Sequence, residues 1–330
     1  MSAVSLSLRD RLEHHQVIIY FAAVGVAAVV AALVPGTDAM EGAINPALAL
    51  MLFVTFLQVP LADLGRAFTR VRFLGALMAS NFVVVPALVA LLLQFLPPDP
   101  MVRLGVLFVL LTPCIDYVVT FSHIGRADAR LLLASTPALL IVQMLLLPVY
   151  LGVFLGEASA DLVQLGPFIH AFVWLIALPL ALAAVVQAWA ARSKTGARVA
   201  AGLGLLPVPA TALVLLIVVA AVVPQLGAAI EAALRVLPLY VAFAVVAPVI
   251  GWTVARMARL EAPAGRAVAF SSATRNSLVV LPLALAVPGA IPVLPAIIVT
   301  QTMVELIASV IYMRLMPKLG ANQATGQGAT

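Results

Sequence analysis

Pro113, Cys114 and Asp116 stand together in an otherwise apolar stretch, and their side chains and backbone could bind a substrate or a cation. A proline removes a backbone donor and interrupts a helix, which leaves carbonyl groups available to an ion. A thiolate is a ligand for soft metals and metalloids. A carboxylate at the centre of a membrane helix costs about 2.5–3.5 kcal/mol, so Asp116 is expected to carry protons or to bind a cation. The stretch therefore predicts a transport site.

Cys114 and Asp116 each have a purely structural interpretation as well. A single cysteine in a membrane segment is usually a small packing residue. Asp116 could be the structural partner of Arg275, which an internal sequence match places in the equivalent segment of the second half. The two interpretations of Asp116 are compatible, because an Asp116–Arg275 pair could open and close with protonation.

Five further polar residues are expected at membrane depth. Glu305 stands one turn after Gln301, and it could couple transport to protons or make a polar packing contact. Arg275 could instead hold an anionic substrate. Asn276, Gln143 and Gln301 could serve coupling or simply join helices by hydrogen bonds.

The sequence offers no catalytic set, so no enzymatic activity is expected. Ser122 and His123 are neighbours, but no third group completes a nucleophilic arrangement. Asp116 is the only aspartate deep in an apolar stretch, which excludes a protease with paired intramembrane aspartates. The single cysteine excludes an intramolecular disulfide and a multi-cysteine metal site. No cofactor is expected. No nucleic-acid partner is expected either, because basic residues do not alternate with aromatic ones in any patch.

The composition is typical of a polytopic membrane protein. The elements that position these residues are therefore expected to be membrane-spanning helices. Of the 330 residues, 64% are hydrophobic and 9% are charged. A span needs about 20 apolar residues, and ten stretches qualify. They are roughly 17–35, 44–64, 73–97, 101–123, 130–156, 167–191, 199–224, 236–256, 266–287 and 292–316.

The basic residues are distributed asymmetrically about these spans. Most of the 18 lysines and arginines fall on one side of a ten-span topology, whereas acidic residues dominate the other side. By the positive-inside rule both termini are cytoplasmic, and the predicted location is a bacterial inner membrane. The connections are short, so residues 1–330 form a single transmembrane domain, with a polar tail at 320–330 that is predicted to be disordered.

The two halves of the chain, about 17–156 and 167–316, resemble each other. Three matches occur in order, at offsets of 162, 160 and 158 residues: 82–86 with 243–248, 114–119 with 274–279, and 137–143 with 295–301. Five spans in each half would give the repeats opposite orientations, as in many secondary transporters. The site is then expected where the broken spans 101–123 and 266–287 meet, at Pro113 and in the polar run 271–277.

At these residues the chain resembles the arsenical resistance-3 family of arsenite efflux carriers, within the bile acid:sodium symporter superfamily. The motif is Thr112-Pro113-Cys114, followed by Ser122 and then by Gly125-Arg126-Ala127-Asp128, and the likeness extends to Val304-Glu305. The resemblance implies a core domain of spans 3–5 and 8–10 and a panel domain of spans 1, 2, 6 and 7. It also implies an As(III) site with the single thiol of Cys114, which is a metalloid site and not a structural metal site, and export by proton exchange.

The chain departs from the family pattern in span 9 and at two charged positions. The family has two adjacent asparagines and then an acidic residue, where this chain has Asn276, Ser277 and an apolar run. The family has small or neutral residues at the positions of Asp116 and Arg275. The span-9 glutamate of sodium-coupled bile-acid carriers aligns with Ser271, which argues against a sodium site here.

The sequence thus predicts a secondary active transporter that exports arsenite, and by the same chemistry antimonite, in exchange for protons. The expected partners are a small oxyanion or metalloid, protons and the lipid bilayer. A soluble ATPase partner stays open, since the chain has no nucleotide-binding motif of its own. The predicted substrate-binding residues are Cys114, Pro113, Asn276, Arg275 and Ser122, and the predicted coupling residues are Asp116, Glu305, Gln143 and Gln301.

Two other classes of function remain alternatives. The first is a cation-coupled symporter for an organic anion, either bile-acid-like or a small carboxylate, in which Arg275 would meet the carboxylate. The second is a sensor or membrane scaffold that transports nothing. The short connections argue against the second alternative, because they leave no domain through which to signal.

Overall fold

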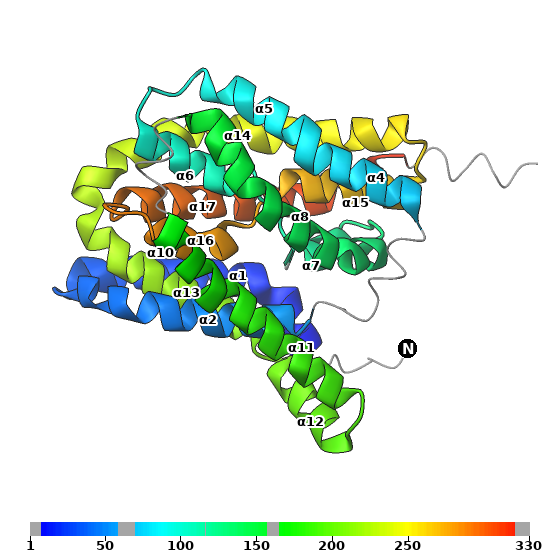
Figure 1. Ribbon diagram of the computed structural model, residues 1–330, viewed down its shortest axis with the longest axis horizontal. Coiled ribbons are helices and arrows are strands. Elements are labelled where there is room, and N and C mark those ends of the chain that lie inside the picture. Colours follow the sequence, from blue (N-terminus) through cyan, green and yellow to red (C-terminus); the bar gives the residue numbers. More distant parts are fainter. Residues whose placement is uncertain (1–7, 59–69, 116, 157–164, 321–330) are drawn as a thin grey trace, which may run out of the picture. The chain divides into compact units, whose positions relative to one another are not determined.

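The computed structural model describes residues 8–58, 70–115, 117–156 and 165–320 (Figure 1). Within these ranges the regular secondary structure is helical, which confirms the predicted all-α class. Asp116 and the tail beyond Gly320 lie outside the described residues, so the predictions made for them stay predictions.

Eight helical stretches in the described part of the chain are long and apolar enough to cross a membrane. They are Leu8–Leu33, Thr37–Phe56, Val71–Leu93, Ala129–Leu155, Val173–Arg192, Lys194–Val222, Ala229–Met257 and Val293–Lys318. Each overlaps one of the ten predicted spans. Large apolar side chains on them face outward, among them Val153 at 74% and Met257 at 78% exposed, as expected of surfaces in contact with lipid.

The two remaining predicted spans are interrupted, and for this reason they fall short of membrane-crossing length. In the first, α6 (Pro100–Leu110) and α7 (Tyr117–Ile124) are separate helices. In the second, α15 (Ala262–Ala273) and α16 (Ser277–Leu285) are separate. Pro113 lacks a helix N–H donor, which favours the first interruption, although Ala129–Leu155 continues through Pro137 and Pro148. The second falls at Thr274–Asn276, within the polar run that predicted it.

The chain divides into two compact units. The first comprises residues 1–58, 164–230 and 281–296, and the second comprises 59–163, 231–280 and 297–330. The core and panel domains that the resemblance implies stay predictions, and Leu281–Ala296 belongs to the first unit.

In the first unit, α1 (Leu8–Leu33) and α2 (Glu41–Phe56) pack against α13 (Pro207–Val222) (Figure 1). The short helix η1 (Thr37–Met40) joins α1 to α2, and η5 (Val223–Gln225) follows α13.

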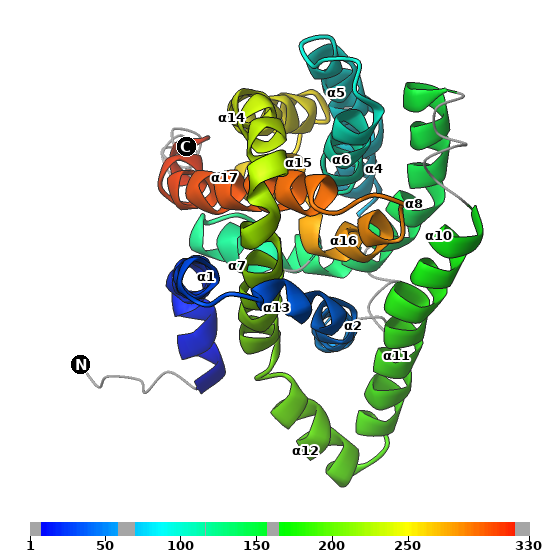
Figure 2. The same ribbon diagram turned by 90° about the vertical axis from the view of Figure 1, so that its left-hand side faces the viewer.

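A second chain segment of the same unit packs on α2. It consists of α10 (Leu165–Phe172), the π-helical turn η4 (Val173–Ala177) and α11 (Leu178–Ala190). Figure 2 shows α11 leading into α12 (Lys194–Leu203). Gln187 of α11 donates from Nε2 to the Phe56 carbonyl at 3.2 Å and to the Leu57 carbonyl at 3.1 Å, which satisfies carbonyls at the end of α2.

The second unit is built around α15 and holds every described residue of the predicted site. Helix α15 packs against α4 (Val71–Ala79), α7 and α8 (Ala129–Leu155), and also against the π-helical turn η3 (Ser80–Val84). The unit also contains α5 (Val85–Leu93), most of α14 (Leu226–Met257) and of α17 (Val293–Leu315), and η6 (Met316–Lys318).

Helix α14 approaches α15 closely, and Gly251 makes this approach possible. A Cβ atom at this position would lie 2.5 Å from Ser272 Oγ and 2.8 Å from Ala269 Cα. Neither distance is compatible with a side chain.

One hydrogen bond in the second unit recurs 162 residues further along the chain. Tyr150 Oη donates to the Phe82 carbonyl at 2.5 Å, and Tyr312 Oη donates to the Ala244 carbonyl. Both tyrosines bind a carbonyl 68 residues earlier in the sequence. The N-cap residues of α6 and α15, Asp99 and Glu261, are related in the same way.

Candidate functional site

The two helix interruptions lie side by side and pair through their backbones. Pro113 and Arg275 face each other in an isolated antiparallel bridge. Cys114 N donates to the Thr274 carbonyl at 3.1 Å, and Asn276 N donates to the Thr112 carbonyl at 2.8 Å. Pro113 therefore occupies a non-hydrogen-bonded position of the bridge, where its missing N–H leaves no acceptor unpaired.

The carboxylate of Glu305 joins the beginnings of both second half-helices. The residue is 2% exposed. Its Oε1 accepts from Tyr117 Oη at 2.6 Å, and its Oε2 accepts from Arg275 N at 2.6 Å. Gln301 Nε2 also donates to Oε2, at 2.5 Å, and the Gln301 side-chain oxygen accepts from Ser277 Oγ. These donors compensate for the loss of water around a buried acidic group.

The guanidinium of Arg275 points the other way, to the ends of both first half-helices. The residue is fully buried. Nη1 donates to the Leu110 carbonyl at 3.2 Å, and Nη2 donates to the carbonyls of Ser271 and Ser272 at 2.6 and 2.7 Å. Leu110 ends α6, and the two serines lie in the last turn of α15. The cation thus lies where helix dipoles concentrate negative charge.

Asn81 is a site residue that the sequence reasoning missed. Its Oδ1 accepts from Arg275 Nη2 at 2.8 Å, while its Nδ2 donates to Ser271 Oγ at 3.0 Å. It lies in the π-helical turn η3, and such turns occur frequently at functional sites. The Ser80-Asn81 pair in an apolar span was the signal that could have found it. Tyr117 was also missed, because nothing in its spacing points to Glu305.

The other predicted site residues are buried, and they differ in their hydrogen-bond partners. Cys114 is fully buried in the paired segment, and Asn276 is 2% exposed, with no partner for its Nδ2 among the described residues. Gln143 in α8 is 1% exposed, and neither amide atom has a partner in the described part of the chain. Ser122 Oγ donates to the Val119 carbonyl at 2.8 Å, a contact within α7.

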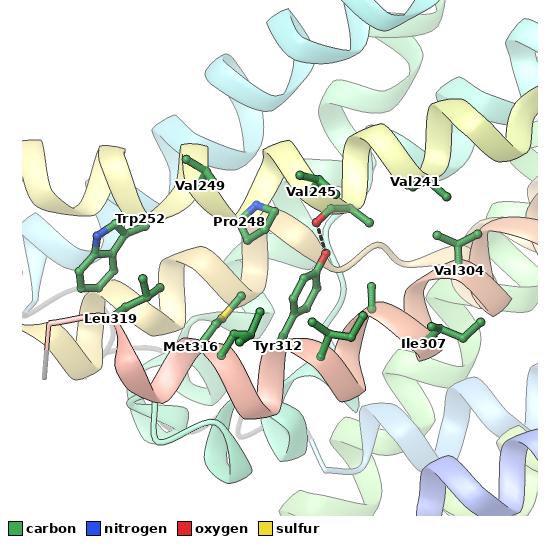
Figure 3. Close-up of a pocket in the computed structure, with 14 residues that line it drawn as sticks. Val241, Val245, Pro248, Val249, Trp252, Val304, Ile307, Tyr312, Met316 and Leu319 are labelled. Carbon is green, nitrogen blue, oxygen red and sulfur yellow. Dashed lines mark hydrogen bonds between the residues drawn. The ribbon is translucent and has the colours of Figure 1, made fainter.

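A separate apolar groove of about 460 Å³ lies between α14 and α17 in the second unit (Figure 3). Val241, Val245 and Val304 are among its lining residues, and the Tyr312 hydroxyl points across from α17 to the Ala244 carbonyl on α14. Ions and oxyanions need polar groups, so the groove does not suit them. No group of three or more histidine, cysteine or acidic side chains that could hold a metal ion occurs in the described residues. The buried polar groups at the paired helix interruptions form the candidate site.

The sequence of the chain matches the model of a known protein family. The model of the Sodium Bile acid symporter family matches residues 45–232, which is more than half of the chain. The chain belongs to this family. Among curated proteins, none matches the chain.

Members of the sodium bile acid symporter family are transporters, which agrees with the prediction of a multi-pass membrane transporter and not an enzyme. The match includes Pro113 and Cys114 at the first interruption. It ends before α15, so Arg275 and Glu305 lie beyond the residues that the family model covers.

Proposed function

We propose that this member of the sodium bile acid symporter family exports arsenite from the cytoplasm in exchange for protons, and antimonite by the same chemistry. Family membership supports secondary transport. The observation that carries the choice of substrate is the position of Cys114, whose backbone N–H is bound to Thr274 at the crossing of two interrupted helices. A thiolate there is a suitable ligand for As(III).

Proton exchange is proposed to pass through Glu305. Its carboxylate is bound by Tyr117 of the first interrupted span and by the backbone of Arg275 in the second. A proton on the carboxylate would remove an acceptor from one of these donors. Protonation would thereby loosen the connection between the two interruptions, and this loosening is the proposed coupling step. Asp116 is proposed as a second carrier on its sequence position alone.

We also propose ten spans in two inverted repeats, with both termini in the cytoplasm of a bacterial cell. The hydrogen bond that recurs at 162 residues supports the repeat, as do the paired interruptions. This single offset relates Gln143 to Glu305, whereas the sequence match at 158 residues related Gln143 to Gln301. The charge distribution along the chain supports the orientation.

A symporter of an organic anion is the second candidate, and the family description favours it. Arg275 would then meet the carboxylate of the substrate. Its two terminal nitrogens already donate to four protein oxygens, so an anion would have to displace at least one of them. These hydrogen bonds of Arg275 are therefore the main obstacle to this second candidate.

The test is arsenite accumulation in an efflux-deficient bacterial strain that expresses the wild type, Cys114→Ser or Ser135→Ala. Ser135 is a matched control, because its hydroxyl is also small and buried but bonds only within α8, to the Leu131 carbonyl. We expect the wild type and Ser135→Ala to lower accumulation and Cys114→Ser to have no effect. Normal accumulation with wild-type protein present in the membrane would refute arsenite export. Uptake of a labelled bile acid that depends on Arg275 would then establish the second candidate.

A further inference from the structure

We infer that the Arg275 guanidinium is a built-in cation, which occupies the place where the ends of two interrupted helices would otherwise bind Na⁺. The inference concerns the coupling ion of the proposed transporter. It rests on the geometry of this one site, whatever the transported substrate, and its test requires no transport.

The atoms around the guanidinium form a ligand set suited to a hard cation. Four neutral oxygens converge on it: the carbonyls of Leu110, Ser271 and Ser272, and the side-chain amide oxygen of Asn81, at distances from 2.6 to 3.2 Å. Carbonyl and amide oxygens are the ligands that hard cations take in proteins. In transporters with interrupted helices, the C-terminal ends of half-helices coordinate Na⁺.

Arg275 fills this position with a permanent charge. A guanidinium stays protonated under all physiological conditions and directs several donors in a rigid plane. In the described residues its terminal nitrogens contact these neutral oxygens and no carboxylate, and the Phe243 ring lies 5.4 Å from its central carbon. Among the described residues, the oxygens that contact this charge are thus those of the two helix ends and of the Asn81 amide, and the helix ends carry partial negative charge.

The nearby acidic group does not offer a second cation site of the same kind. Both oxygens of Glu305 already accept N–H or O–H donors from Tyr117, Arg275 and Gln301. A sodium ion at Glu305 would have to displace these donors. It would also have to lie near a guanidinium of the same charge in a medium where such repulsion is strong.

The experiment measures the melting temperature of the purified, detergent-solubilised protein in NaCl and in choline chloride of equal ionic strength. We expect no sodium-specific shift for the wild type. Arg275→Ala should melt at a lower temperature in choline. Addition of NaCl, or of millimolar methylguanidinium chloride, should raise that temperature saturably, by roughly 2–4 °C.

Arg266→Ala is the matched control. Arg266 is also buried and also donates to backbone carbonyls, those of Leu319 at 2.9 Å and Arg126 at 2.7 Å, but it lies in the first turns of α15. Its removal should lower the melting temperature with no recovery by either cation.

Two results would overturn the inference. One is a saturable, sodium-specific stabilisation of the wild type, and the other is a folded Arg275→Ala variant that neither cation stabilises. If Arg275→Ala does not fold, Arg275→Lys retains the charge and should show no sodium-specific shift, and the wild-type measurement still decides. A failure of arsenite export leaves these outcomes unchanged, because none of them involves substrate.

Discussion

At the scale of single residues, two buried groups of opposite charge bind different helix ends at the paired interruptions. The Glu305 carboxylate binds donors at the beginnings of α7 and α16, and the Arg275 guanidinium binds acceptors at the ends of α6 and α15. Each charge thus lies at the helix termini of opposite partial charge. Together they stabilise a pair of interruptions whose backbone groups would otherwise be unpaired in the membrane.

Replacement of Glu305 by Gln should uncouple transport from protons. The amide cannot release a proton, and its NH₂ group would face donors that now bind a carboxylate oxygen. We expect gradient-driven flux in proteoliposomes to fall at least tenfold, while substrate exchange without a gradient persists. Glu231→Gln is the control, since Glu231 is an exposed residue that pairs with Arg235 on the surface. Equal loss of both activities in Glu305→Gln would contradict a coupling role.

Removal of the Tyr117 hydroxyl should affect coupling as well as stability. Tyr117→Phe deletes one hydrogen bond to Glu305 and should lower the free energy of unfolding by about 1–2 kcal/mol. Tyr150→Phe deletes a comparable bond to a carbonyl away from the interruptions. Both variants should be destabilised in chemical denaturation, but only Tyr117→Phe should alter the dependence of flux on the proton gradient. Identical flux in the two variants would count against the proposal.

At the scale of elements, the position of α15 decides whether the site can form. Its last turn supplies Ser271 and Ser272 to Arg275, and Gly251 lets α14 pack closely against that turn. The Ser80 and Ser272 hydroxyls bond to each other at 2.7 Å and connect the same turn to η3. The oxygens around Arg275 are therefore fixed by helix packing. A displacement of α14 should change their distances to the guanidinium.

Gly251→Ala is expected to destabilise the protein by about 1–3 kcal/mol, because the added methyl group would overlap Ser272 and the α15 backbone. Gly75→Ala is the matched control. Gly75 is helical, and a Cβ atom there meets nothing within 4 Å, so its replacement should be neutral or stabilise by up to about 1 kcal/mol. Thermal unfolding of the two variants measures the difference. A stability of Gly251→Ala equal to that of Gly75→Ala would show that α14 can move away without loss.

At the scale of the whole molecule, the proposed ten-span topology places the first connection and the connection before α12 on opposite sides of the membrane. Asp38 is an exposed residue of η1 in the first connection, and Lys194 is the exposed first residue of α12. The number of proposed spans between the two residues is odd, which places them on opposite sides. One span more or fewer would bring both residues to the same side.

Single cysteines can test this topology in a Cys114→Ser background, which contains no other thiol. We expect a membrane-impermeant thiol reagent to label Asp38→Cys in intact cells and to label Lys194→Cys only after the membrane is opened. Labelling of both positions in intact cells would refute the ten-span arrangement.

The sequence by itself determined the membrane class, the apolar stretches and the places where two of them are interrupted. These are local properties: span length depends on consecutive apolar residues, and Pro113 lacks the backbone donor that a continuous helix would use. The sequence also marked Arg275 as a candidate for substrate binding and Glu305 and Gln301 as candidates for coupling, because polar residues in an apolar span require partners.

Only the tertiary structure decided which partners these residues have. Tyr117 and Glu305 are 188 residues apart, and Asn81 and Arg275 are 194 apart, so no spacing along the chain could relate them. Sequence reasoning offered Asp116 or a substrate anion as the partner of Arg275, whereas the described contacts of its guanidinium are carbonyl and amide oxygens. Helix ends acquire their partial charge only once the helices have formed, and two of them converge on one guanidinium only after packing.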